Sequence, residues 1–136
     1  MRADRPVTVD GAEIVVLEGL NVLQPAPKDG SSSTALLVSD FVDFSVYVDA
    51  DETDLVAWYL HRIRTLRAAA IGDPTSFFAQ FATLSDDELT SFGTAVWAAI
   101  NRPNVVDHIA PTRSRADLVI EKGSNHAIRR VTMRTR

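Results

Sequence analysis

An apolar, β-branched run near the start of the chain places the strongest constraint on how it can fold. The run extends from Ile14 to Leu17 and ends abruptly at Glu18 and Gly19. A continuous apolar stretch of this length is typical of a strand buried on both faces of a parallel sheet. We therefore predict a first strand over residues 13–17 that carries Glu18 to the carboxyl edge of the sheet, where ligands bind in open α/β folds.

A carboxylate in that place commonly serves a magnesium–nucleotide site. The phosphate-binding loop that usually accompanies it, G-x-x-x-x-G-K-[ST], does not occur in the sequence, because neither Lys28 nor Lys122 follows a glycine. Any function proposed for the chain has to explain an acid at the end of a strand without its phosphate loop.

Length and composition favour a single soluble domain over residues 1–136. With 136 residues, of which 46% are hydrophobic, the chain can bury a sizeable core. It has no apolar stretch near the roughly 20 residues that span a bilayer, and its polar start lacks the apolar core of a signal peptide. Zero cysteines exclude disulfides and thiolate metal sites. We expect a cytoplasmic protein with no membrane partner.

Charge is distributed unevenly along the chain. Residues 1–60 contain 11 acidic and 3 basic residues, whereas residues 61–136 contain 7 acidic and 11 basic residues. A positive second half suits an anionic ligand, but it also arises when helices form salt bridges with an acidic sheet edge. Nucleic acid is not an expected partner, because the basic residues are dispersed and no aromatic residues alternate with them.

A second strand and a first helix follow. Residues 43–49 mix β-branched and aromatic residues and end in an acid, so we predict a strand parallel to the first. Asp51 can cap a helix that continues to about Ala70. At about 100° per residue its apolar side chains fall on one arc: Leu55, Tyr59, Ile63, Leu66 and Ala70.

Arg62 is the unusual residue of this helix because it lies inside the apolar arc. A guanidinium on a buried stripe has to meet a carboxylate, a cluster of carbonyls or a ligand phosphate. Both a structural pair with an aspartate and a ligand contact satisfy that requirement.

The middle of the chain contains an exposed loop, an aromatic cluster and a second helix. Residues 25–34 are rich in Pro, Gly and Ser and indicate a mobile loop. The SFFAQF segment at residues 76–81 either fills the core or forms an aromatic wall beside a ligand. Ser85 and Glu88 form a capping box. We expect Pro103 to end the helix that follows, just past Asn101, whose amide can satisfy the last helix carbonyls.

The last third is predicted to form two strands, residues 116–121 and 128–134, joined by a short polar loop. Lys122 and His126 flank this loop. Such side chains are usually solvated, but both have apolar parts that can cover a flat ring.

These pieces resemble, in order and almost without gaps, the carboxyl-terminal half of the bacterial type I pantothenate kinases. The resemblance covers roughly Ala12 to Arg134. It is carried by EGLNVLQ, VSDFVDFSVYVDA, WYxxRxxxLR from Trp58, DPxSxF from Asp73, Ile100-Asn101, PTRxRADL from Pro111 and KGxNH from Lys122. It implies an α/β, P-loop kinase-like fold of which the amino-terminal P-loop part is lacking.

The family uses ATP and Mg to phosphorylate pantothenate, and coenzyme A inhibits it. The resemblance implies that Tyr59 and Asn101 contact pantothenate, that Arg62 lies at the nucleotide phosphates, and that Lys122 and His126 flank the adenine. It makes Glu18 a candidate residue on the magnesium side, with Glu18 and Arg62 as the catalytic pair.

Four positions depart from the family pattern. Ile63 and Leu66 replace aromatic residues, and Ala79 and Phe81 replace a histidine and a tyrosine, in what is the pantothenate and thiol pocket of the family. Selectivity for acyl groups or inhibitors is therefore expected to differ.

The family's phosphate loop and catalytic aspartate have no counterpart in the sequence, so we expect this polypeptide alone to be catalytically incompetent. Three hypotheses remain: a kinase part complemented by a P-loop chain, a non-catalytic nucleotide- or coenzyme A-binding regulator, and a structural partner of a full-length paralogue that forms an oligomer or heteromer through an exposed sheet edge.

Overall fold

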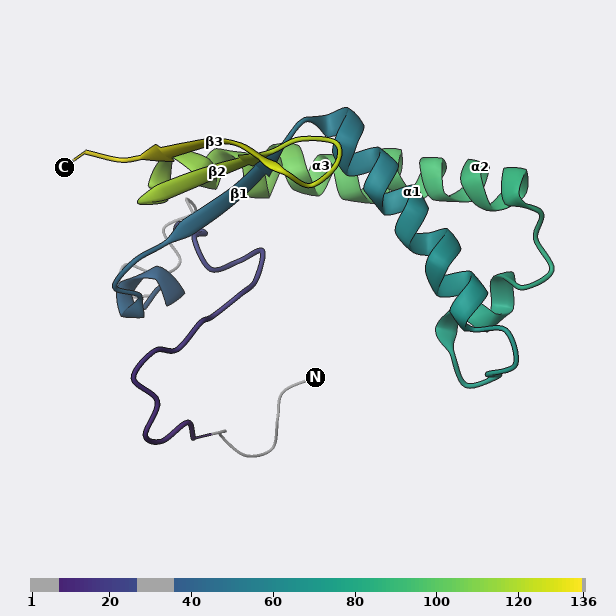
Figure 1. Cartoon of the computed structure of the whole chain (residues 1–136), viewed down its shortest axis with the longest axis horizontal. Coiled ribbons are helices and arrows are strands. Elements are labelled where there is room, and N and C mark those ends of the chain that lie inside the picture. Colours follow the sequence, from purple (N-terminus) through teal and green to yellow (C-terminus); the bar gives the residue numbers. More distant parts are fainter. Residues whose placement is uncertain (1–7, 27–35, 136) are drawn as a thin grey trace.

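A computed structural model describes residues 8–26 and 36–135 of the chain (Figure 1). Its three-stranded sheet has the order β1-β2-β3. The strands are β1 (Val46–Ala50), β2 (Leu118–Lys122) and β3 (Ile128–Met133), and the α-helices are α1 (Glu52–Ala69), α2 (Asp86–Val96) and α3 (Arg102–Asn104). The chain is therefore α/β, as predicted.

The sheet is mixed. β1 pairs with β2 in parallel, so Asp49 lies opposite Glu121, while β2 and β3 form an antiparallel hairpin. The three α-helices lie between β1 and β2 in sequence and form the long crossover that a parallel pair needs. The predicted second strand and the predicted hairpin are both confirmed.

The predicted first strand is wrong. Residues 12–19 have no regular secondary structure, and the apolar side chains of Ile14 and Val16 are 83% and 86% exposed. An extended segment becomes a strand only by pairing with a neighbour. Within the described ranges β1 pairs with β2 alone, so the parallel neighbour of the second strand is the last-third strand, not residues 13–17.

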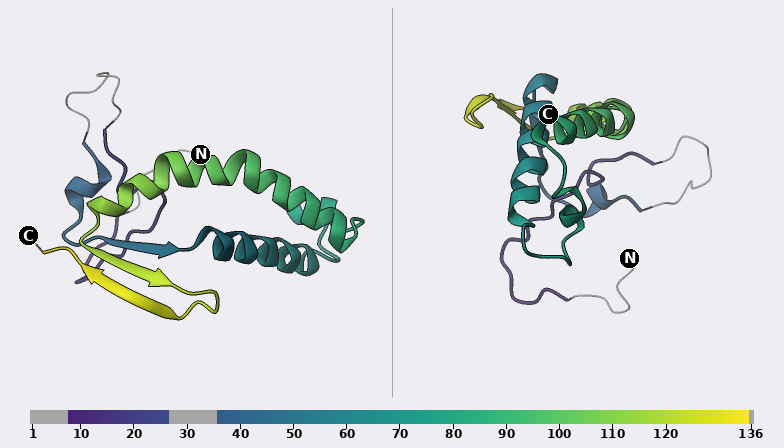
Figure 2. Two further views of the ribbon diagram at one scale, coloured as in Figure 1. Left: turned by 90° about the horizontal axis from the view of Figure 1, so that it is seen from above. Right: turned by 90° about the vertical axis from the view of Figure 1, so that its right-hand side faces the viewer.

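Helix α1 extends over almost the predicted range. Asp51 is its first flanking residue, but its carboxylate accepts a hydrogen bond from Arg129 Nη1 on β3 at 2.9 Å and makes no capping bond to the helix. Ile63 and Ala70 are buried on the predicted arc. Figure 2 shows α1 and α2 side by side beyond the end of the sheet, and the helical run that begins with α2 continues back alongside the strands.

Helix α2 begins at the predicted capping box. Ser85 N–H donates to Glu88 Oε2 at 2.8 Å, and Glu88 N–H donates to Ser85 Oγ at 3.2 Å. Two backbone N–H groups at the start of the helix, which have no acceptor within it, are thereby each bonded to the side chain of the other residue. Leu89, at 1% exposure, is the most deeply buried large side chain of the described residues.

Pro103 does not end this helix, contrary to the prediction. The run continues as a π-helical turn (Trp97–Asn101), α3, a second π-helical turn (Val105–Ile109) and a 3₁₀ helix (Ala110–Arg115). Proline removes one N–H and clashes with the carbonyl four residues earlier. The wide turns on both sides of α3 relieve that conflict, so the chain passes through Pro103 without stopping.

The proposed loop at residues 25–34 is described only at Pro25 and Ala26. The rest of it lies outside the described residues.

Candidate functional site

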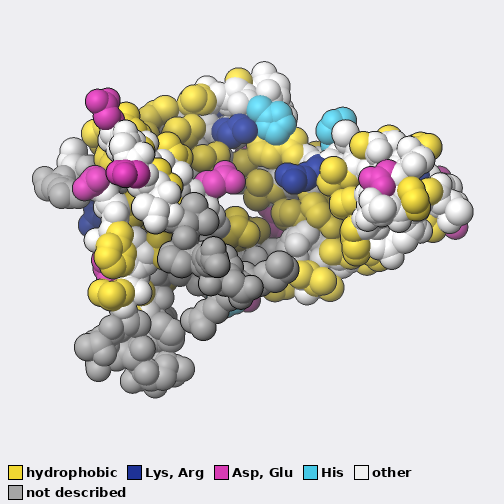
Figure 3. Space-filling model, turned by 90° about the horizontal axis from the view of Figure 1, so that it is seen from below, with side chains coloured by type: hydrophobic (Ala, Val, Ile, Leu, Met, Phe, Trp, Pro, Cys, Tyr) yellow, Lys and Arg dark blue, Asp and Glu magenta, His cyan; other side chains and the backbone are white. Residues whose placement is uncertain are grey.

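An open, mainly apolar groove of about 730 Å³ lies between α1, the phenylalanine-rich turn and the long helical run. Aromatic and aliphatic side chains form most of its walls: Leu55, Ile63, Leu66, Phe77, Phe78, Phe81, Phe92, Val96 and Trp97. Figure 3 shows a hollow on the lower face of the molecule, with hydrophobic side chains around it and basic and histidine side chains beside it. A concave apolar site with a few polar groups is the usual form of a small-molecule site.

Three of the six predicted site residues lie in this groove: Tyr59, Arg62 and Asn101. Tyr59 projects from α1 and faces Trp97, with ring centroids 5.6 Å apart. Asn101 is the last residue of the π-helical turn that Trp97 opens. Among the described residues the Asn101 amide makes no hydrogen bond, so it does not cap the helix in the way that sequence reasoning allowed.

Arg62 is exposed at the groove and forms no hydrogen bond or ion pair within residues 8–26 and 36–135. The structural Arg–Asp pair considered from sequence is therefore not found among these residues. An unpaired guanidinium beside an apolar wall is a suitable partner for a carboxylate or phosphate, which it can bind with two parallel hydrogen bonds.

Lys122 and His126 lie together at the β2–β3 hairpin, where both contact Trp58 of α1. The His126 ring stacks on the Trp58 indole with centroids 4.1 Å apart and planes 24° apart, and Lys122 Nζ lies 5.2 Å from the indole centroid. Trp58 Nε1 also donates to the carbonyl of Ser124 at 2.9 Å. Trp58 itself lines the groove, so it joins the groove to the hairpin loop.

Sequence reasoning named Trp58 as the first residue of the WYxxRxxxLR segment and gave it no role of its own. The signal that could have found it is the combination of an indole N–H and ring with a Lys and a His in one polar loop.

Glu18 is not brought together with the other predicted residues. It is exposed in the irregular segment 12–19 and makes no hydrogen bond or ion pair within the described parts of the chain. Leu20, two residues later, does line the groove. The segment that contains Glu18 therefore passes the groove, but no contact fixes the carboxylate there.

The carboxyl edge of the parallel strands carries a different pair of acids, Asp49 and Glu121, with Arg113 between them. Arg113 Nε lies 2.6 Å from Asp49 Oδ2, and Arg113 Nη2 lies 2.8 Å from Glu121 Oε1. The hydrogen bond to Asp49 raises the pKa of Arg113 above its ordinary value. Burial, followed by the charge of Asp49, raises the pKa of Tyr47 on the same strand.

Sequence reasoning missed Arg113, although it stands inside the PTRxRADL segment. The Arg113 guanidinium neutralises the carboxylates of Asp49 and Glu121, which would otherwise repel each other across the β1–β2 pair.

The phenylalanine-rich segment forms a 3₁₀ helix (Phe77–Phe81) at one end of the groove. Phe77 is 70% exposed, whereas Phe78 and Phe81 are partly buried and all three line the groove. Phe81 packs on Phe92 of α2 with centroids 5.1 Å apart. Both interpretations of the SFFAQF segment therefore apply in part: the cluster packs on α2, and it also forms an aromatic wall of the groove.

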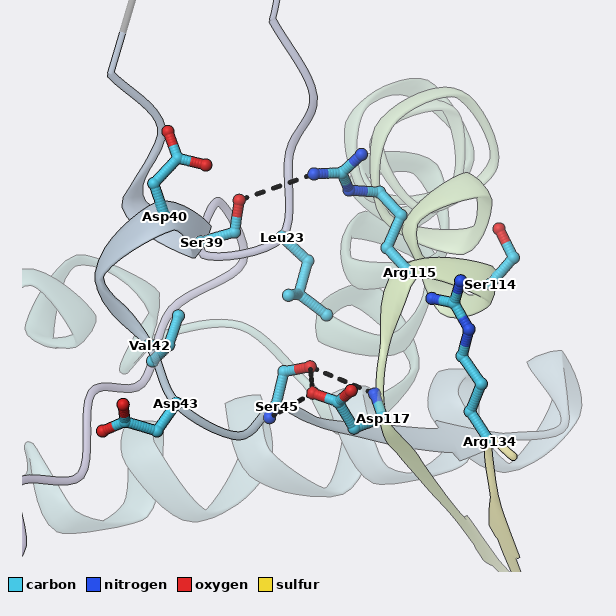
Figure 4. Close-up of a pocket in the computed structure, with 10 residues that line it drawn as sticks. All are labelled: Leu23, Ser39, Asp40, Val42, Asp43, Ser45, Ser114, Arg115, Asp117 and Arg134. Atoms are coloured by element: carbon cyan, nitrogen blue, oxygen red, sulfur yellow. Dashed lines mark hydrogen bonds between the residues drawn. The ribbon is translucent and has the colours of Figure 1, made fainter. Parts of the chain in front are cut away.

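A second, polar hollow of about 450 Å³ lies at the amino end of β1 (Figure 4). Ser45 N–H and Oγ–H donate to Asp117 Oδ2 at 3.0 and 2.8 Å, and Arg115 Nη2 donates to Ser39 Oγ at 3.4 Å. These bonds connect the segment before β1 to the segment before β2, at the end of the sheet opposite to Asp49.

None of the helices formed by the described residues combines the length and the apolar character that crossing a bilayer requires. Those residues also contain no group of three or more His, Cys, Asp or Glu side chains that could hold a metal ion.

Several bacterial proteins named pantothenate kinase are similar to this chain over nearly its whole length. The kinase of Sorangium cellulosum is 48% identical over 132 residues, which is 97% of this chain and 42% of that protein. The kinase of Haemophilus ducreyi is 49% identical over 131 residues, and that of Bacillus velezensis 46% over 127 residues, covering 42% and 40% of those proteins. No protein-family model matches the chain.

The chain thus spans between 40% and 42% of the length of these kinases. Identity of this level across more than nine tenths of the chain identifies it as a relative of the bacterial pantothenate kinases.

Proposed function

We propose that this chain is the pantothenate-binding part of a kinase that uses ATP to convert pantothenate to 4'-phosphopantothenate, at the start of coenzyme A synthesis in the cytoplasm. The observation that supports this most is the meeting of Tyr59, Arg62 and Asn101 in one apolar groove. Two of these are the residues matched to pantothenate, and the third is the residue matched to the nucleotide phosphates.

The chemistry of the groove suits that substrate. Pantothenate combines a dimethyl-substituted carbon with hydroxyl, amide and carboxylate groups. The aliphatic and aromatic walls can take the apolar part, while the Tyr59 hydroxyl and the Asn101 amide can hydrogen-bond the polar groups. Arg62 would then hold the phosphate side of the reaction, where charge stabilisation gives most of the rate in phosphoryl transfer.

The nucleotide is proposed to lie with its base at Lys122 and His126. Mg²⁺ usually binds through one or two carboxylates together with substrate phosphates and water, which fits a chain whose described residues build no all-protein metal site. Glu18 is the carboxylate proposed to face that ion. The mixed sheet with its helical crossover would correspond to part of a P-loop kinase fold, with the chain as one structural unit.

Turnover is expected to need a phosphate loop that the sequence does not contain. The decisive experiment measures ADP release with ATP, Mg²⁺ and pantothenate, for this chain alone and after mixing with the remaining section of the Sorangium cellulosum kinase. We expect no turnover alone and measurable turnover in the mixture, lost again with Arg62→Ala in this chain. If neither sample releases ADP, the proposal of a complemented kinase is rejected.

A bare apolar face of the sheet indicates where such a second segment would pack. Val46 and Val48 of β1 lie opposite Leu118 and Ile120 of β2, which in turn lie opposite Met133 and Val131 of β3. Residues directly opposite each other share a face. Four of these six side chains are 45–65% exposed.

We propose that amphipathic helices of a segment carrying a phosphate loop cover this face, because parallel strands are almost always covered by helices on both faces. The greater length of the matched kinases supplies such a segment.

Val48→Asp tests this surface, since Val48 is 61% exposed and its replacement places a charge on the face. We expect light scattering to detect a heteromer between this chain and the remaining kinase section. Val48→Asp should lower the affinity of the two chains at least tenfold. Thr53→Asp, on the exposed side of α1, should leave that affinity unchanged. A homodimer that excludes the kinase section, or a heteromer insensitive to Val48→Asp, would contradict it.

A non-catalytic nucleotide- or coenzyme A-binding regulator is the second candidate function. It is favoured by the contacts of Lys122 and His126 with Trp58, which need no phosphate loop. It predicts saturable heat with ADP or coenzyme A for this chain alone, reduced by Arg62→Ala, and no turnover in any mixture. Absence of heat with each of these ligands would exclude it.

A further inference from the structure

We propose that Trp58 is a positioning residue: it holds His126 and Lys122 in place as a site for the flat ring of a nucleotide base. The assignment of that ring to a nucleotide rests on the proposed function. The role of Trp58 rests on the geometry of its indole, which makes separate contacts with Lys122 at the end of β2 and with Ser124 and His126 in the hairpin loop.

Those contacts differ in kind. The indole ring carries the imidazole of His126 at 4.1 Å and the ammonium of Lys122 at 5.2 Å, and its N–H holds the backbone of Ser124 at 2.9 Å. Offset stacking, a cation over a ring face and a hydrogen bond each favour one arrangement of the loop. One side chain of α1 thus orders both members of the pair.

The loop has a fixed backbone but little else to hold its side chains. Gly123 N–H donates to the carbonyl of Ala127 at 2.9 Å, and His126 N–H donates to the carbonyl of Gly123 at 2.8 Å. His126 has the left-handed φ of +65°, which is uncommon for a residue with a side chain. Among the described residues, the His126 imidazole and the Lys122 ammonium have no hydrogen-bond or ion-pair partner, so Trp58 supplies their ordering contact.

Ordering the pair in advance lowers the cost of binding. A histidine and a lysine that start as solvated, mobile side chains lose rotamer entropy when they close on a ligand. Trp58 covers one face of the His126 imidazole, and because His126 is an exposed residue, a ligand ring can approach its other face. Because the same indole lines the groove, it also sets the position of the base site relative to Tyr59 and Arg62.

The experiment uses the full chain with ADP as the probe and two variants. Trp58→Phe keeps a ring but loses the N–H donor, whereas Trp58→Leu loses both. We expect the calorimetric Kd for ADP to rise about tenfold for Trp58→Leu and only a few-fold for Trp58→Phe. Far-UV circular dichroism checks the fold of each variant, and Ser91→Ala on the exposed side of α2 is the control that leaves both the groove and the loop contacts intact.

A second measurement does not depend on the nucleotide. Stacking on the indole should shift the imidazole proton resonances of His126 upfield, and these are distinguished from those of His61 and His108 by His126→Gln. We expect this shift to disappear in Trp58→Leu and to persist, reduced, in Trp58→Phe.

The outcomes separate the positioning role of Trp58 from the assignment of the site to a nucleotide base. Equal ADP affinity in the wild type and Trp58→Leu, or an unchanged His126 resonance in Trp58→Leu, overturns the positioning role of Trp58 and leaves the nucleotide site standing. No ADP binding by the wild type overturns the nucleotide assignment itself, and with it the base-binding role inferred for Trp58.

Discussion

Tyr59 and Trp97 pack against each other across the groove, with ring centroids 5.6 Å apart and ring planes at 49°. Tyr59 belongs to α1, and Trp97 opens the π-helical turn that ends at Asn101. The pair therefore sets the spacing between the two elements that carry the polar groups of the groove. A substitution at either ring is expected to affect the groove as well as stability.

Trp97 should tolerate replacement by Phe far better than by Ala. Its side chain is 9% exposed, and its buried Nε1 has no hydrogen-bond partner among the described residues. Truncation to Ala leaves a cavity and should cost about 3–5 kcal/mol in the free energy of unfolding. Phe keeps the ring contact and removes the unpaired donor, so we expect a loss below about 1 kcal/mol. Urea denaturation of the two variants measures both values, and equal losses would contradict the account.

Gly93→Ala should disturb the groove because α1 and α2 approach closely at this glycine. A Cβ there would collide with Ile63 Cδ1 and would lie 2.8 Å from Leu60 Cδ2. Ile63 is buried and lines the groove, so it cannot move aside without changing the wall. Overpacking of this kind costs about 1–3 kcal/mol, partly offset by the better helix propensity of Ala.

The measurement for Gly93→Ala is again urea denaturation, with Ser91→Ala on the exposed side of α2 as the control. A gain in stability for Gly93→Ala similar to that for Ser91→Ala would show that the contact between α1 and α2 is loose.

Helix α2 should lose stability in acid through Glu88. The backbone and side-chain hydrogen bonds from Ser85 lower the pKa of Glu88 below its ordinary value. A lowered folded-state pKa means that the contribution is present above the ordinary value and is lost as the pH falls through the lowered one. The stability difference between the wild type and Glu88→Ala should therefore shrink from pH 7 to about pH 3.

Chemical denaturation at the two pH values tests this, with Ser91→Ala as a substitution that removes no titrating group. A difference between the wild type and Glu88→Ala that stays constant or grows in acid would refute the role of the capping box.

Arg113 should stabilise the β1–β2 pair by separating Asp49 from Glu121. Arg113→Gln leaves the two carboxylates facing each other, and we expect a loss of up to about 1 kcal/mol, since Arg113 is 44% exposed. The loss should be larger at low ionic strength. Adding Asp49→Asn to Arg113→Gln should recover part of it, which a double-mutant cycle measures. Equal losses with and without Asp49→Asn would mean that the charges do not interact.

Much of the fold was predictable because its signals are local. The arc of apolar residues on α1, the capping box at Ser85 and the alternation in the last third each depend on residues a few positions apart. These elements were confirmed.

The wrong predictions, the first strand and the end of the second helix, concern elements whose structure depends on neighbouring segments. Ile14–Leu17 has the composition of a strand, but no described strand lies beside it, and composition does not reveal a missing neighbour. Pro103 fails to stop the helix because π-helical turns on both sides absorb it, which no local rule anticipates.

The site could be predicted in part. Arg62 stood out on an apolar arc before any resemblance was considered, and the groove contains it together with Tyr59 and Asn101. Trp58 was missed because its partners, Ser124 and His126, are far away in sequence. Arg113 was missed because one of its two partners, Asp49, lies 64 positions away on the neighbouring strand. The roles assigned to Tyr59, Arg62 and Asn101 remain predictions, as does that of Glu18, whose position no contact among the described residues fixes.

Calorimetric titration of the full chain with pantothenate tests the central claim most directly. The account predicts saturable heat for the wild type, loss of most of that heat in Asn101→Ala and Tyr59→Phe, and full retention in Ser91→Ala. The reason is that the proposed function places the pantothenate contacts in the groove, which needs no phosphate loop to form. No saturable heat with the wild type, or binding that is equal in Asn101→Ala, would contradict it.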